Sequence, residues 1–284
     1  MTRRTRWCLC AFFCLAPATA AQDEAPRFAV AGLVLPSAAP AADAALYTAL
    51  GFEPVRQADA AQLLRLGDLL LVLDGGRPCP RAPAVAPLHF NLRVPDLEQA
   101  ARTVEQHGGQ RLDPTPIAFV LGHAVRVRDA SGNFFELVDL AQRPVDAPRL
   151  FNLSLHKAGM ASLRALFVDQ LGFAVFSDDY LPRTLPLHQR GAAPLVLHDD
   201  THADRPVPPA TAPGRGAALL LAAKDALAAL GACDDLRAEA PVPSVWFGAV
   251  LVVRAEGGVE LRLASQDAVH QAVPGPGVGG ATGG

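Results

Sequence analysis

An internal repeat is the feature of this 284-residue sequence that most limits its fold. The stretch LYTALGFEPV at 46–55 returns as LFVDQLGFAVF at 166–176, and GNFFELVDL at 132–140 returns in weaker form as GGVELRLAS at 257–265. A repeat at this spacing indicates two copies of one domain, joined by the proline-bearing linker AQRPVDAPR. We therefore expect domain 1 at 27–140 and a more diverged domain 2 at 150–265.

Each copy divides again into two units with the same order of a strand, a helix and three strands. Hydrophobic periodicity places helices near 40–50 and 96–107 in the first copy, and near 159–171 and 223–230 in the second. Gly51 and Gly108 follow the first two helices, where a left-handed residue often ends a helix. The predicted fold class is α+β, with four βαβββ modules.

The two ends of the chain lie outside the repeated modules. Residues 1–21 combine an arginine-rich start, the apolar run WCLCAFFCLAPATA and small residues at a cleavage site, which together predict a secretory signal peptide. The expected location is therefore periplasmic or secreted, with no membrane span after cleavage. Residues 266–284, ending in VPGPGVGGATGG, are expected to be a disordered tail.

Composition excludes some functions. Without Arg3, Arg4 and Arg6, the 25 basic residues become 22 against 28 acidic ones, a formal net charge of −6. Lys157 and Lys224 are the only lysines, and no basic stripe is interleaved with aromatic residues, so no nucleic-acid partner is expected. Cys79 and Cys233 remain after signal cleavage, and we expect them not to be bonded to each other because they fall in different modules of different copies.

The stretch VRDASGNFFELVDL, at 127–140, sets an acid in an otherwise apolar strand. The run DASGN predicts a turn with a positive φ at Gly132, and the residues after it alternate as a strand. Glu136 is then flanked by apolar neighbours on both faces of that strand. A buried carboxylate must be protonated, paired or bound to a cation, so Glu136 is a candidate site residue.

Four strand–helix–strand–strand–strand modules, with LGF after the first helix and D-x-x-G-N-x-x-E-L entering the last strand, resemble the vicinal oxygen chelate superfamily. That group includes glyoxalase I, fosfomycin-resistance transferases, bleomycin-resistance proteins and extradiol dioxygenases. The resemblance covers nearly all of residues 27–265. It implies that paired modules curl into an open cup, and that the glutamate of the last strand is a metal ligand or base in metal-using members.

The strand in PLHFNLRVPD supports a site in that cup. Its apolar residues Leu88, Phe90, Leu92 and Val94 alternate with His89, Asn91 and Arg93, so one face is core and the other is polar. The resemblance places a histidine ligand at His89. His89 and Glu136 would suit Zn, Mn or Fe(II), or would form only a structural hydrogen bond with each other.

A third metal ligand is missing from the expected place. The resemblance puts it on the first strand, in FAVAGLVLP, where Ala31 or Gly32 cannot bind a metal. Catalytic sites usually supply three protein ligands. His123, in LGHAVRVRD, is the best substitute from the sequence as a ligand-binding or metal-binding residue, and the alternative for it is a solvated or wall histidine.

The second copy keeps less of this pattern. Its corresponding positions are Asn152, Ala218 and Glu260, and Arg262 stands two residues beyond Glu260 on the same strand face. We expect Glu260 and Arg262 to form a modest surface ion pair, and His198 to be an exposed histidine at a strand end.

Two functions remain from the sequence. The first is an exported binding protein, similar to bleomycin-resistance proteins, that holds a small oxygen-rich molecule in the cup of domain 1 without a complete metal site. The second is a metal-dependent glyoxalase-type or dioxygenase-type enzyme that uses His89 and Glu136, the metal acting as a Lewis acid. The missing first-strand histidine favours the binding protein.

Overall fold

The computed structural model describes residues 28–79, 88–119, 121–157, 159–188, 194–199, 217–231, 236, 239, 241–254 and 259–273. The predicted signal peptide, Cys233 and residues 274–284 lie outside these ranges. Within them, no helix is long and apolar enough to cross a membrane.

The first half of the chain contains two modules. The first consists of β1 (Ala29–Pro36), α1 (Pro40–Ala49), β2 (Glu53–Ala58), β3 (Ala61–Leu66) and β4 (Leu69–Asp74). The second consists of β5 (Leu88–Arg93), α2 (Leu97–Gln106), β6 (Gln110–Arg111), β7 (Ile117–Phe119), β8 (Gly122–Arg128) and β9 (Phe134–Leu140). Positive φ angles of 95° at Gly51 and 80° at Gly108 confirm the predicted helix ends.

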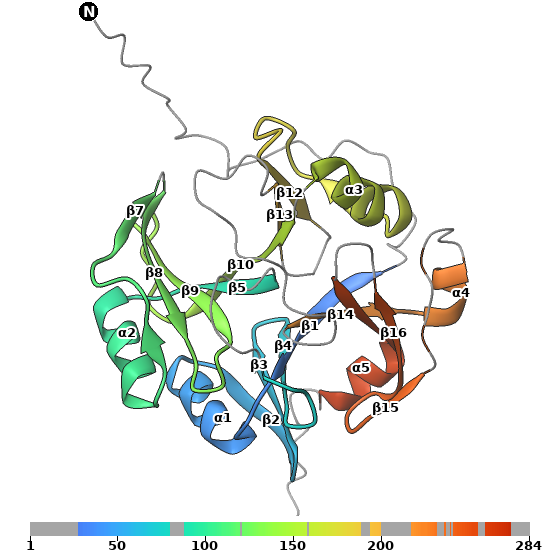
Figure 1. Cartoon of the computed structure of the whole chain (residues 1–284), viewed down its shortest axis with the longest axis horizontal. Helices are drawn as coiled ribbons and strands as arrows, with labels where there is room; N and C mark the ends of the chain where they lie inside the picture. Colours follow the sequence, from blue (N-terminus) through green and yellow to red (C-terminus); the bar gives the residue numbers. More distant parts are fainter. Residues whose placement is uncertain are drawn as a thin grey trace, which may run out of the picture.

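The second half repeats this order. Its third module has β10 (Arg149–Lys157), α3 (Met160–Arg164), the π-helix η1 (Ala165–Gln170), β11 (Ala174–Val175), β12 (Thr184–His188) and β13 (Leu195–Asp199). The fourth has β14 (Ala218–Ala223), α4 (Ala226–Gly231), β15 (Val242–Ser244), β16 (Gly248–Arg254) and β17 (Glu260–Ser265), followed by α5 (Gln266–Ala272). The α+β fold of four modules is therefore confirmed (Figure 1).

The modules combine into two curled sheets across the two halves of the chain. Sheet A has the order β15-β16-β17-β14-β1-β4-β3-β2 and joins the first module to the fourth; sheet B has the order β11-β12-β13-β10-β5-β9-β8-β6 and joins the second to the third. The joins are the antiparallel pairs β1–β14 and β5–β10 (Figure 1). This corrects the grouping of the modules into cups at 27–140 and 150–265, because each cup takes one module from each half.

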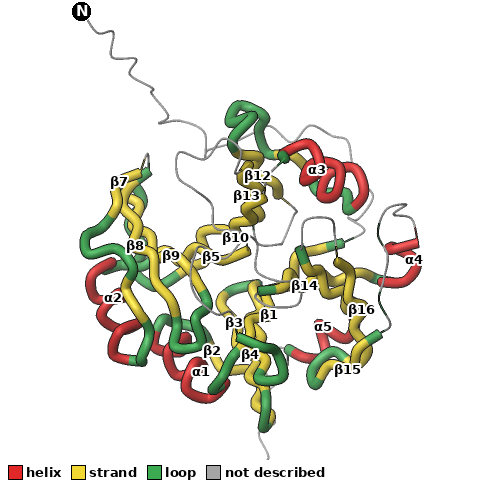
Figure 2. Tube along the Cα trace, viewed as in Figure 1, coloured by secondary structure: helices red, strands yellow, loops and turns green. Residues whose placement is uncertain are grey.

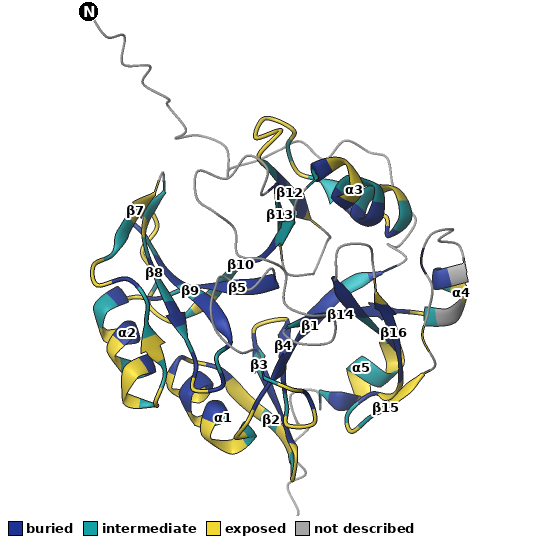
Figure 3. Cartoon of the chain, in the orientation of Figure 1, coloured by how far each residue is buried: buried dark blue, intermediate teal, exposed yellow. Residues whose placement is uncertain are grey.

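The main core lies on one face of each sheet. Leu88, Phe90 and Leu92 of β5 join this core with side chains from α1 and α2, as the alternation in PLHFNLRVPD predicted. Tyr47 of α1 contacts Phe90 and Phe135, with ring centroids 6.1 and 5.8 Å apart, so a helix of the first module packs on the strands of the second. The central strands β4, β5 and β14 are buried over most of their length (Figure 3).

The opposite face of sheet A is also filled. Ala31, Val34, Val72 and Leu220 form a second apolar cluster there with Trp246 and Phe247. Helix α5 covers this face (Figure 2). Ala272 is fully buried, and Ser265 Oγ accepts a hydrogen bond from the backbone N–H of Ala268 at 3.1 Å. The start of the predicted disordered tail is therefore an ordered helix, because its Ala and Val residues complete the apolar lining.

The DASGN turn ties the second module to the first. Its glycine has the predicted positive φ, 89° at Gly132. The Asp129 carboxylate accepts hydrogen bonds from the Tyr47 hydroxyl at 2.8 Å and from the backbone and side-chain N–H groups of Asn133 at 2.8 and 2.7 Å. Asn133 also donates to the carbonyl oxygen of Pro36 at 2.8 Å, so α1, β1 and the turn share one buried network.

Burial, together with the charge of nearby Asp43, raises the pKa of Asp129 to about 6, although hydrogen bonds from Asn133 and Tyr47 act in the opposite direction. Because its pKa is raised, Asp129 binds its proton more tightly in the folded state than in the unfolded chain. The free energy of unfolding should therefore fall as pH rises from about 4 to about 6.

We predict that Asp129→Asn removes this component of the pH dependence. Relative to the parent, the variant should gain up to about 3 kcal/mol of stability between pH 4 and pH 7, since a pKa difference of two units is worth about that much. Urea unfolding of both proteins across this range measures the difference. A constant gap between the two curves would contradict the raised pKa.

Candidate functional site

The inner face of sheet B, opposite the face that packs on α1 and α2, carries polar side chains in rows across the strands. One row contains Glu136 of β9, Asn91 of β5 and Asn152 of β10, because Asn91 is the register partner of both others. The next row contains His89 and Ser154, which are also register partners. Both halves of the chain therefore contribute to this face.

Asn91 lies at the centre of the first row and is 6 % exposed. Its Nδ2 donates hydrogen bonds to Asn152 Oδ1 at 2.6 Å and to Ser154 Oγ at 2.9 Å. Its Oδ1 is buried and accepts no hydrogen bond from the described part of the chain. A buried acceptor without a donor costs about 1–3 kcal/mol, so this atom is ready to accept from a bound molecule.

Three histidines stack along the same face. The ring centroids of His89 and His156 are 5.3 Å apart with an interplanar angle of 19°, and those of His156 and His198 are 4.3 Å apart at 8°. Burial, with the nearby His156, lowers the pKa of His198 to about 3, so this ring is neutral at physiological pH. His198 was expected to be exposed, but it lies within β13, where Leu195 and Leu197 face the core and His198 faces the site.

Glu136 is half-buried on this face rather than enclosed as expected. Its register partners are Asn91 on one side and Arg126 on the other. Arg126 donates to Asp113, with Nε 2.9 Å from Oδ2. That hydrogen bonding, and then the charges of Asp113 and Glu136, raise the pKa of Arg126. Glu136 thus lies between Arg126, whose guanidinium is held by Asp113, and Asn91.

His123 does not share this face. It is exposed at the start of β8, its register partner is Asp139, and Val125 on the same face of β8 belongs to the main core. The interpretation of His123 as a ligand beside His89 and Glu136 does not fit this position, because the alternation of the strand turns its side chain to the opposite side of the sheet. The alternative interpretation, a solvated histidine, agrees with its exposure.

No family model matches the sequence, and no curated protein matches it. Among solved structures, glyoxalase I from Zea mays is similar with a TM-score of 0.60 at 14 % identity, covering 86 % of this chain and 95 % of that one. A variant of the same enzyme gives a TM-score of 0.62 at 14 % identity, covering 85 % and 93 %. A putative dioxygenase from Bacillus subtilis gives 0.60 at 12 % identity, covering 88 % and 91 %.

The chain has the vicinal oxygen chelate fold. The similarity covers most of the chain, so it includes both curled sheets and confirms the fold that the repeated modules predicted. At these identities, it says nothing about which side chains act.

The donor set of this vicinal oxygen chelate fold does not fit a metal ion. Among the described residues, no group of three His, Cys, Asp or Glu side chains is placed to hold one. The lone pairs of a histidine lie in the ring plane, so the nearly parallel rings of His89, His156 and His198 do not direct them to one point. Asn91, rather than His89, is the register partner of Glu136.

The first-strand position that lacked a histidine belongs to sheet A. A Cβ atom at Gly32 would lie 2.0 Å from the carbonyl oxygen of Leu70, so the close approach of β1 and β4 excludes any side chain there. Ala218 of β14 is in the same sheet and is fully buried. Neither residue faces the inner face of sheet B.

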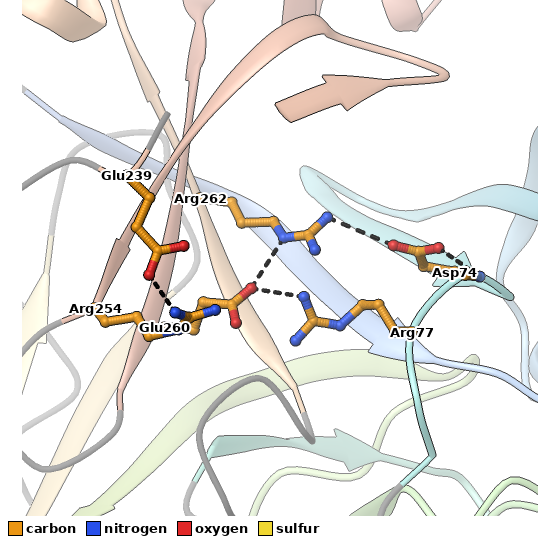
Figure 4. A network of polar contacts seen from close by, with 7 residues as sticks. Asp74, Arg77, Glu239, Arg254, Glu260 and Arg262 are labelled. Carbon is orange, nitrogen blue, oxygen red and sulfur yellow. Dashed lines mark hydrogen bonds and ion pairs between the residues drawn. The ribbon is translucent and has the colours of Figure 1, made fainter. Parts of the chain in front are cut away.

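The structure also corrects the expectation for Glu260, which lies in sheet A. It is 6 % exposed, and its Oε1 lies 2.6 Å from Arg77 Nη1 and 3.1 Å from Arg262 Nε (Figure 4). Arg262 also lies 3.5 Å from Asp74, so the network joins β17 to the end of β4. Burial would raise the pKa of Glu260, but the two arginines outweigh it and hold that pKa below its ordinary value. The expected surface pair is a buried ion network that links the first and last modules.

We predict that the same substitution changes the free energy of unfolding little at Glu136 and strongly at Glu260. Glu136→Gln should alter the free energy of unfolding by at most about 1 kcal/mol, because its carboxylate is half-buried and Arg126 keeps Asp113 as a partner. Glu260→Gln should cost about 3–5 kcal/mol, because it leaves the buried Arg77 without its carboxylate.

Urea unfolding of the two variants measures both values. Equal losses would contradict the assignment of one acid to a binding face and the other to the frame of the fold.

Proposed function

We propose that this protein is an exported, metal-independent binder of a small oxygen-rich molecule, which it holds on the inner face of sheet B. The observation that carries the proposal is Asn91 Oδ1, a buried acceptor without a donor in the described part of the chain, in the row between Glu136 and Asn152. One ligand hydroxyl would donate to Asn91 Oδ1, and a second would donate to the Glu136 carboxylate.

The remaining polar groups suit the same kind of ligand. Ser154 and Asn152 already hold the Asn91 amide through its Nδ2, which fixes the direction of Oδ1. The neutral His198 offers a ring nitrogen and an aromatic face. Contacts of this type orient a neutral hydroxyl or carbonyl compound without a Lewis acid.

The alternative is a metal-dependent enzyme with glyoxalase-type or dioxygenase-type chemistry at His89 and Glu136. Metal loading of the purified protein distinguishes it from the proposal. After dialysis against Zn²⁺, Mn²⁺ or anaerobic Fe²⁺, we expect bound metal well below one equivalent and no change in Tm. One equivalent of metal that is lost in His89→Ala would overturn the proposal in favour of the enzyme.

Ligand binding is tested by thermal shift with gluconate, glucitol and catechol as probes. A ligand that stabilises the parent should bind Asn91→Ala at least about tenfold more weakly, because the hydrogen bond from the ligand hydroxyl to Asn91 Oδ1 is lost. His123→Ala is the matched control on the opposite face and should bind like the parent. Equal weakening in both variants would contradict a site at Asn91.

Export is supported by the arginine-rich start and the small residues at 18–21. Mass spectrometry of the native protein should show a chain that begins near Ala21 or Gln22. A chain that retains Met1 in a cytosolic fraction would contradict export.

A further inference from the structure

Three arginines gather where β5 ends and β10 begins. Arg93 is the last residue of β5, Arg149 is the first residue of β10, and the two are register partners across the antiparallel pair. Arg143 lies in the connection between β9 and β10, and its carbonyl oxygen accepts a hydrogen bond from Arg93 Nη2. The cluster therefore adjoins the row of Glu136, Asn91 and Asn152, one row further along the same strands.

Two positive charges and one acid act on Arg93. Burial lowers the pKa of Arg93, the positive charges of Arg143 and Arg149 lower it further, and Asp139 is the acid that acts against them. Like charges directly opposite each other on paired strands destabilise a sheet. A negatively charged group beside Arg93 and Arg149 would reduce this repulsion.

Arg93 also has an unused donor. Its Nε is buried and has no acceptor among the described residues, although its Nη2 is bonded to Arg143. A guanidinium presents its N–H groups in a fixed fork that matches the oxygens of a carboxylate or a phosphate. An anion at this position would accept from Nε and neutralise the repulsion between Arg93 and Arg149.

We propose that Arg93, Arg143 and Arg149 form an anion subsite that takes the carboxylate or phosphate group of the ligand. This inference rests on the proposed function for the rest of the ligand, whose hydroxyl meets Asn91 in the adjacent row. Two residues along a strand span about 7 Å, so one small molecule reaches both rows. The ligand class is therefore a small hydroxylated acid.

Inorganic phosphate tests the subsite directly. At low ionic strength, phosphate should raise the Tm of the full chain more than chloride at the same ionic strength, since exposed charges are screened equally by both salts. In Arg149→Gln, half-saturation by phosphate should weaken by at least about tenfold, because a charge-assisted contact is lost. Arg149 is exposed, so this change leaves the fold intact.

Arg102→Gln is the matched control, because it removes one exposed positive charge from α2, away from the cluster. It should bind phosphate like the parent. In the absence of phosphate, Arg149→Gln should melt at the same temperature as the parent or higher, because the repulsion on Arg93 is relieved. The subsite is refuted if phosphate acts no more strongly than chloride, or if the two variants weaken phosphate binding equally.

A second pair of probes separates this inference from the proposed function. Phosphate must still bind Asn91→Ala, because Asn91 is not part of the subsite, and failure there would overturn the subsite as placed. Gluconate should bind the parent more tightly than glucitol, and Arg149→Gln should remove that preference. If glucitol binds as tightly as gluconate and requires Asn91, the binding function stands and the anion subsite is wrong.

Discussion

The antiparallel pairing of β5 with β10 is the constraint on which the site depends. It places Asn91 beside Asn152 and His89 beside Ser154, and so brings the first half of the chain against the second on one polar face. The pair β1–β14 does the same for sheet A. Each sheet is therefore composite. The linker between the repeats connects β9 to β10, two strands of sheet B that are separated by β5.

The two composite sheets have different inner faces. In sheet A, alanine, valine and leucine side chains with Trp246 form a packed cluster that α5 covers, and the glutamate of the last strand is tied to Arg77 and Arg262. In sheet B, the corresponding positions carry amides, hydroxyls and imidazoles. The same backbone plan thus supports one apolar interior and one polar face, and the side chains make the difference.

Much of the fold could be predicted from the sequence. The LGF and GNFFEL repeats predicted the modules, and the alternation in PLHFNLRVPD predicted which side of β5 is polar. These signals are local, since they depend on the two-residue period of a strand and on glycine at helix ends.

The pairing of modules could not be predicted in this way. Either arrangement of four similar modules buries similar apolar faces, so periodicity does not choose between them. The pairing of the modules places His156 and His198 beside His89, and Arg77 beside Glu260. His123 was misplaced for a simpler reason, because its parity with Val125 on β8 already put it on the core side. Counting along HAVRVR from the apolar valines would have shown this.

If the face built from both halves of the chain binds the ligand and the other is filled, side chains on the two faces should respond differently to the ligand. One NMR spectrum reports on both faces, through the side-chain amide resonances of Asn91 and Asn152 and the indole resonance of Trp246. During titration with gluconate, both amide resonances should shift together while the indole resonance stays unchanged. Shifts confined to one half of the chain, or centred on Trp246, would contradict this arrangement.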